Sequence, residues 1–155
     1  MLKQSGLQMT NSLRTIITKQ TQADFATKPG AQTHKFLQKI SSIEDLKKAD
    51  SALLKSIISN QNIARFFEKG SKTEVPIAGT INGKFISRRI DRLLINHKTK
   101  TIDILDYKTD VDKSANTEKY YRQIDEYKKL LQDIYPNYKI NGYILWLHNL
   151  ELEAV

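Results

Sequence analysis

The sequence predicts an α+β domain, in which helices flank a central, mostly antiparallel mixed sheet of about four strands. Helical apolar spacing dominates residues 31–69, and strand-like runs rich in Ile, Val, Leu, Phe and Thr follow over residues 73–108. A long helical pattern and one more strand complete the order, which combines antiparallel hairpins with a crossover element. The length of 155 residues fits one ordinary domain.

The helical half divides into several predicted elements. Apolar spacing indicates helices over residues 31–40 and 43–59 and a shorter one over residues 62–69, and Gly70 closes this half. The polar segment 21–30 carries Pro29 and Gly30 and is predicted to be a loop. It separates an N-terminal arm, residues 1–28, from the main domain, residues 29–155.

The second half contains the predicted sheet. Strands are expected over residues 73–81, 84–96 and 101–108, joined by an Asn82-Gly83 turn of type I′ and by a reversal over residues 97–100. A helix over residues 116–134 follows and stops before Pro136. The last strand is expected over residues 140–147, with its neighbour in the sheet left open.

The composition limits the partners and the chemistry. With 25 Lys and Arg against 17 Asp and Glu, the formal net charge is +8, which favours nucleic acid as a partner, although many small proteins are basic only for solubility. An anionic membrane is the weaker choice, because no helix combines a basic face with a broad apolar one. The absence of an apolar leader or spanning run makes a cytoplasmic location the expectation.

The cysteine count points to the class of metal that the chain could use. Zero cysteines exclude disulfides, thiol catalysis, Cys-ligated zinc and iron–sulfur clusters. Any metal would therefore be bound by oxygen and imidazole ligands, which favours Mg²⁺ or Mn²⁺.

Two acids in neighbouring strands carry the strongest local signal. Alternation places Asp106 and Lys108 on the same strand face as Ile102 and Ile104, where charged groups are costly unless they are paired or bind a metal. A salt bridge at the strand end is the structural alternative. A short hairpin would bring Asp91 of the preceding strand close to Asp106, and two such carboxylates repel unless a divalent cation or a shared proton intervenes.

These motifs resemble those of a known superfamily. Ile90-Asp91-Arg92 followed by Leu105-Asp106-Tyr107-Lys108-Thr109 resembles the PD-(D/E)XK nucleases, and within them the RecB and AddA nuclease domains. The segment from Gly30 to Leu37 is similar to the G-x-x-x-H helix of the RecB-like exonuclease family, and residues 123–127 match its Q-x-x-x-Y helix. The resemblance covers Gly30 to Tyr127 and implies a restriction-endonuclease-like core. Arg88 departs from the pattern, since family members usually have Gly there.

The resemblance also implies roles for individual residues. It implies that Mg²⁺ or Mn²⁺ is held by His34, Asp91, Asp106 and the backbone carbonyl of Tyr107. Lys108 would orient or deprotonate the attacking water and stabilise developing charge, while Gln123 and Tyr127 would orient the site or touch the substrate backbone. Glu74 resembles an acidic position that often precedes the catalytic strands.

These roles have structural alternatives. His34 shares a helix face with Leu37 and could be a core histidine, and Glu74 could be a solvated residue at a strand edge. Gln123 and Tyr127 are expected to turn inward, which a packed helix with one satisfied amide would also explain. The candidate phosphate contacts are Arg88, Arg89, Arg92, Arg122 and Lys128.

Together these features predict a metal-dependent nuclease that hydrolyses phosphodiester bonds of DNA, an exonuclease of repair or recombination. The chain has no G-x-x-x-x-G-K-[ST] loop and so no helicase of its own, which a separate helicase partner could supply. RNA as substrate, strandedness, polarity and oligomeric state stay open. The alternative is a non-catalytic DNA-binding module that retains the nuclease fold.

Overall fold

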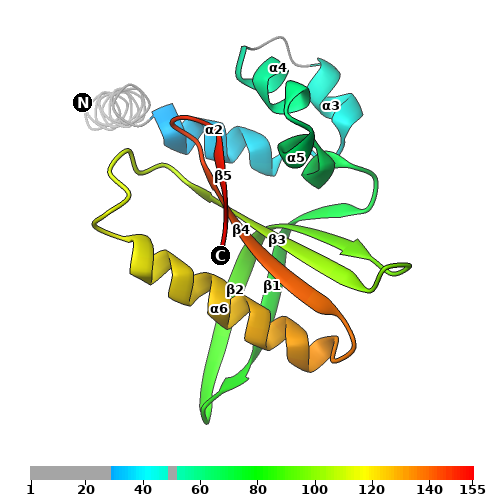
Figure 1. Ribbon diagram of the computed structural model, residues 1–155, viewed down its shortest axis with the longest axis vertical. Coiled ribbons are helices and arrows are strands. Elements are labelled where there is room, and N and C mark those ends of the chain that lie inside the picture. The colour runs from blue at the N-terminus through cyan, green and yellow to red at the C-terminus, as the bar shows by residue number, and fades with distance from the viewer. Residues whose placement is uncertain (1–28, 49–51) are drawn as a thin grey trace, which may run out of the picture.

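The computed structural model describes residues 29–48 and 52–155, which form a mixed five-stranded sheet flanked by helices (Figure 1). The predicted α+β class is confirmed, with five strands in the order β1-β2-β3-β4-β5 in place of about four. The predicted N-terminal arm, residues 1–28, lies outside the described residues.

The helical half contains more separate elements than the spacing of its apolar residues predicted. Its elements are α2 (Pro29–Gln38), α3 (Ile43–Lys48), α4 (Ala52–Ser59), α5 (Gln61–Ala64) and the 3₁₀ turn η1 (Arg65–Phe67). The predicted loop is wrong at its end, because Pro29 and Gly30 belong to α2. Proline suits the first turn of a helix, where its missing N–H costs no hydrogen bond.

The sheet half follows the predicted order. Its elements are β1 (Ser71–Ile81), β2 (Lys84–Asn96), β3 (Thr101–Lys108), α6 (Thr117–Ile134), β4 (Lys139–Trp146) and β5 (Glu151–Ala154). Asn82 and Gly83 have φ angles of 50° and 76°, as the predicted type I′ turn requires. Strand β4 pairs parallel to β3 through the α6 crossover, and β5, which the sequence analysis missed, pairs antiparallel to β4.

Alternation along β3 separates two cores. Ile102 and Ile104 pack with α6, whereas Leu105 and Tyr107 pack with α2 to η1 on the other face of the sheet. The close approach of α6 to β4 depends on Gly142, because a Cβ there would collide with the Ile124 side chain. Each face of the sheet is thus covered by its own helical layer.

A buried arginine joins the sheet to the helical layer of α2 to η1. Arg92 of β2 is 0% exposed, and its guanidinium lies over the Phe67 ring at 4.0 Å. It donates to Leu37 O at 3.1 Å and to Ile40 O, at the C-terminal end of α2 where carbonyls lack helical partners. Further bonds reach Phe66 O, Ser71 Oγ and Tyr107 OH at 3.2, 3.0 and 3.0 Å. This cation fixes where α2 ends against the sheet.

We expect Arg92→Met to lower the free energy of unfolding by about 3 kcal/mol or more, because several buried acceptors would lose their donor at once. Urea denaturation followed by circular dichroism measures the change. Arg122→Met, on an exposed position of α6, is the matched control and should stay within about 0.5 kcal/mol. Equal effects of the two substitutions would contradict this role of Arg92.

Candidate active site

The ladder between β2 and β3 opens where the two predicted acids lie. Its last regular pair at this end is Arg92 with Leu105, and one step further the register would place Asp91 opposite Asp106. Instead, Asp91 Oδ2 accepts the backbone N–H of Tyr107 at 2.8 Å. A side chain thus replaces the backbone pairing, and the opened end of the sheet becomes available to ligands.

The alternation of β2 also changes phase at Asp91. Ile90 and Leu93 both pack in the α6 core, whereas Arg92 between them reaches the opposite layer. On β1, Glu74 lies at the register position facing Asp91 and has φ 51°, a left-handed conformation that is uncommon for a residue with a side chain. Such local distortions re-aim side chains next to functional sites.

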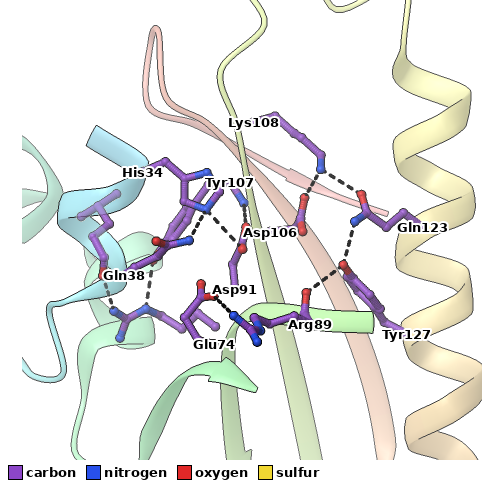
Figure 2. Close-up of polar contacts among 12 residues, drawn as sticks. His34, Gln38, Glu74, Arg89, Asp91, Asp106, Tyr107, Lys108, Gln123 and Tyr127 are labelled. Atoms are coloured by element: carbon purple, nitrogen blue, oxygen red, sulfur yellow. Dashed lines mark hydrogen bonds and ion pairs between the residues drawn. The ribbon is translucent and has the colours of Figure 1, made fainter. Parts of the chain in front are cut away.

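Three potential metal ligands meet at this distortion (Figure 2). His34 Nε2 lies 3.2 Å from Asp91 Oδ1, and the ligand atoms of His34, Glu74 and Asp91 all lie within 4.8 Å of one another. Glu74 Oε1 is buried without a hydrogen-bond partner, although Oε2 lies 3.7 Å from Arg89 Nη1. One imidazole and two carboxylates, one of them with an unpartnered buried oxygen, fit a divalent cation such as Mn²⁺ or Mg²⁺.

A second polar chain runs from β3 to α6 beside these ligands (Figure 2). Lys108 Nζ lies 2.5 Å from Asp106 Oδ2 and donates to Gln123 Oε1 at 2.8 Å. Gln123 Nε2 in turn donates to Tyr127 OH at 2.7 Å, and Tyr127 OH donates to the Arg89 carbonyl at 3.1 Å. Because that carbonyl can only accept, Tyr127 must accept from Gln123, which turns the amide oxygen towards Lys108.

The crowding of acids shifts two pKa values in the same direction. Burial raises the pKa of Asp106 to about 6, with a further contribution from the nearby Asp91 carboxylate, and Lys108 only partly opposes both. The hydrogen bond that the imidazole donates to Asp91 raises the pKa of His34, although burial of the imidazole opposes it. Without a bound cation, both groups therefore keep a proton to higher pH than they would in the unfolded chain.

The predicted site residues mostly converge, with some corrections. Gln123 and Tyr127 turn inward as expected, and Tyr127 is 1% exposed. Asp106 is outside the group of three potential ligands and pairs with Lys108, while Glu74, which sequence reasoning gave little weight, is within that group. The predicted backbone ligand is the carbonyl of Tyr107. The Tyr107 N–H points towards β2, and because the N–H and C=O of one strand residue point to the same neighbouring strand, this carbonyl also points towards β2.

The candidate phosphate contacts divide into accessible and inaccessible groups. Arg92 was wrongly placed among them, because its guanidinium is fully buried and hydrogen-bonded to the protein. Its position in a basic, polar stretch of sequence gave no sign of burial. Lys128 donates to the Val155 carbonyl. Arg88, Arg89 and Arg122 are exposed on β2 and α6.

Comparison with known proteins adds no assignment. No protein-family model matches the chain, and no curated protein matches it. Among the helices of the described residues, none combines the length and the apolar character needed to span a bilayer.

We expect the metal-free protein to be more stable at pH 5.5 than at pH 8. Both Asp106 and His34 bind a proton more tightly in the folded than in the unfolded chain, so stability is lost as the pH rises through their folded pKa values. Asp106 alone should contribute about 1 kcal/mol over this range, with its folded pKa of about 6. Thermal unfolding in EDTA measures this difference, and Asp106→Asn should reduce it. A flat pH profile of the unchanged protein would contradict the raised pKa values.

We expect Mn²⁺ to raise the melting temperature, because a ligand that binds only the folded state adds stability of about 2.7 kcal/mol at a hundred times its dissociation constant. Glu74→Gln should abolish most of the rise, since it removes one charged ligand of the group of three. Glu44→Gln, at an exposed position in the first turn of α3, is the matched control. An undiminished rise in Glu74→Gln would exclude Glu74 as a ligand.

Proposed function

We propose that this chain is a divalent-metal-dependent nuclease that hydrolyses phosphodiester bonds of DNA, with the RecB-like arrangement of the PD-(D/E)XK superfamily. The observation that carries the proposal is the convergence, at the opened end of β2 and β3, of a potential cation site with a buried acid–lysine pair. Phosphodiester hydrolysis needs both, because negative charge builds up on the phosphate while water attacks it. The net charge of +8 suits a polyanionic substrate.

His34, Glu74 and Asp91 would hold the cation, and the location of Asp106 beside Asp91 makes it a further candidate ligand. A bound Mg²⁺ or Mn²⁺ would supply Lewis-acid polarisation of a phosphate oxygen and lower the pKa of a nearby water. The chain's own contribution to holding the charge is the set of imidazole and carboxylate ligands on α2, β1, β2 and β3.

Lys108 would act on the phosphate and on the water. Its side chain is only 14% exposed, and its ammonium is held between Asp106 and Gln123, so it presents fixed positive charge where negative charge develops. The hydrogen bonds from Gln123 through Tyr127 to the β2 backbone keep this orientation without touching the reacting atoms. Gln123 and Tyr127 are therefore positioning residues in this proposal.

The biological setting proposed is DNA repair or recombination in the cytoplasm, with attack from a DNA end and with unwinding supplied by a separate helicase. The pathway, the attack from an end and the helicase come from the motif resemblance, which spans α2 to α6, whereas the location comes from the lack of an apolar leader or spanning run in the sequence. The opened sheet end, with candidate ligands from α2 and from strands β1 to β3, supports the chemistry rather than the pathway.

We expect purified protein to degrade end-labelled linear DNA with Mg²⁺ or Mn²⁺, to leave closed circular DNA intact and to be inactive in EDTA. Asp106→Asn and Lys108→Gln should each lower the rate at least about a hundredfold, because the first removes a candidate cation ligand and the second removes positive charge beside the reacting phosphate. The matched controls are Asp125→Asn and Lys129→Gln, which change an exposed pair on α6 with side chains 58% and 56% exposed.

The outcomes of this assay separate the alternatives. Cutting of circular DNA would replace an exonuclease by an endonuclease. Binding of DNA without cutting in either metal would overturn the proposal in favour of a non-catalytic DNA-binding module. Activity that survives both site substitutions would point to a contaminating nuclease.

A further inference from the structure

A basic cleft lies beside Lys108, between β2 and the N-terminal half of α6, and has a volume of about 540 Å³. Arg88 of β2 and Lys119 and Arg122 of α6 line it together with Lys108, while Glu126 is its single acid. Because Lys108 belongs both to this cleft and to the candidate active site, a chain lying in the cleft would lead directly to the reacting position.

The acid in the cleft is paired with one of its cations. Arg88 Nε donates to Glu126 Oε2 at 3.0 Å, with side chains 42% and 31% exposed. Ion pairs this exposed contribute little to stability, so a phosphate can replace the carboxylate at small cost. An arginine can then bind two phosphate oxygens at once, which a lysine cannot.

The wall of the cleft is held in place by bonds that do not involve Arg88, Lys119 or Arg122. Tyr120 OH donates to Asp110 Oδ2 at 2.7 Å, and Asn116 donates to the same oxygen at 3.1 Å. The Tyr120 ring lies 4.2 Å from Lys108 Nζ. The start of α6 is therefore anchored to the segment after β3, and Lys119 and Arg122 are carried on a fixed helical turn.

We propose that this cleft binds the backbone of single-stranded DNA next to the cleaved bond, and that Glu126 limits the affinity by competing for Arg88. Lys119 and Arg122 contact phosphates in the cleft, and Arg88 leaves Glu126 to contact another. A volume of about 540 Å³ is that of a site for one drug-sized ligand, and a nucleotide of one strand fits it. The choice of DNA as ligand rests on the proposed function.

The test is binding of a fluorescein-labelled oligothymidylate to the full chain in EDTA, measured by anisotropy over a series of salt concentrations. Lys119→Gln and Arg122→Gln should each weaken binding about fivefold near 0.1 M salt and reduce the slope of log K against log salt by about 0.7, as for one lost phosphate contact with a single strand. Lys129→Gln, which removes a lysine from α6 outside the cleft, is the matched control and should change neither.

For Glu126, substitution should change the affinity in the opposite direction. Glu126→Gln should tighten binding about threefold, because it frees Arg88 and removes a repulsive charge, whereas Asp125→Asn on the neighbouring position should have little effect. Arg88→Gln should weaken binding and should also remove the gain from Glu126→Gln in the double variant. This coupling separates a specific exchange from a general change of net charge.

Several results would overturn the inference. Equal affinities of the cleft variants and the control variants would overturn it, and so would the lack of any gain in affinity in Glu126→Gln. Tighter binding of a duplex of the same sequence would contradict a single-stranded ligand. Tighter binding of oligouridylate would assign the cleft to RNA. Because EDTA removes the metal, a protein that binds as described but never cuts upholds the cleft and fails the proposed function. A protein that cuts DNA while its cleft variants bind normally upholds the proposed function and contradicts the cleft as a binding site.

Discussion

The buried guanidinium of Arg92 is the contact on which the arrangement of the site depends. It is a cation inside the protein whose donors go to carbonyl and hydroxyl oxygens of α2, η1, β1 and β3, so its burial is compensated by many hydrogen bonds. Two of these acceptors, the carbonyls of Leu37 and Ile40, follow His34 closely in the chain. The same contact therefore sets the position of His34 against the sheet. Asp91 is the next residue along β2, so one strand segment anchors the helix and presents the carboxylate that meets it.

The candidate site lies where the regular pairing of the sheet is interrupted. In a regular ladder Glu74 and Asp91 would be cross-strand neighbours whose side chains share a face, and Asp91 would also lie opposite Asp106. With the left-handed backbone at Glu74 and the phase change at Asp91, Asp91 instead pairs with His34 and the Tyr107 N–H, whereas Asp106 pairs with Lys108. Burial, with a further contribution from the Asp91 carboxylate, raises the pKa of Asp106 to about 6. A bound cation, as the proposed function requires, would relieve the repulsion between these carboxylates.

Sequence reasoning was accurate where the determinants are local. The Asn82-Gly83 turn, the two faces of β3 and the inward side of α6 follow from positive φ preferences and from periods of 2 and 3.6 residues. It failed for β5, whose four residues contain two glutamates and a single large apolar side chain, too short a run for alternation to be decisive. The helix predicted over residues 43–59 corresponds to α3 and α4, and residues 49–51 between them lie outside the described part of the chain.

By itself the sequence determined the class of fold, the order of its main elements and the candidate residues His34, Asp91, Asp106, Lys108, Gln123 and Tyr127. Only the tertiary structure decided that Arg92 faces inward and Glu74 joins His34 and Asp91, since both depend on a backbone distortion shared by two strands. It likewise decided that Arg88 and Arg122, far apart in the chain, line one cleft with Lys108. Local propensity cannot specify such contacts, because the energy that selects them arises only when the helical layers close on the sheet.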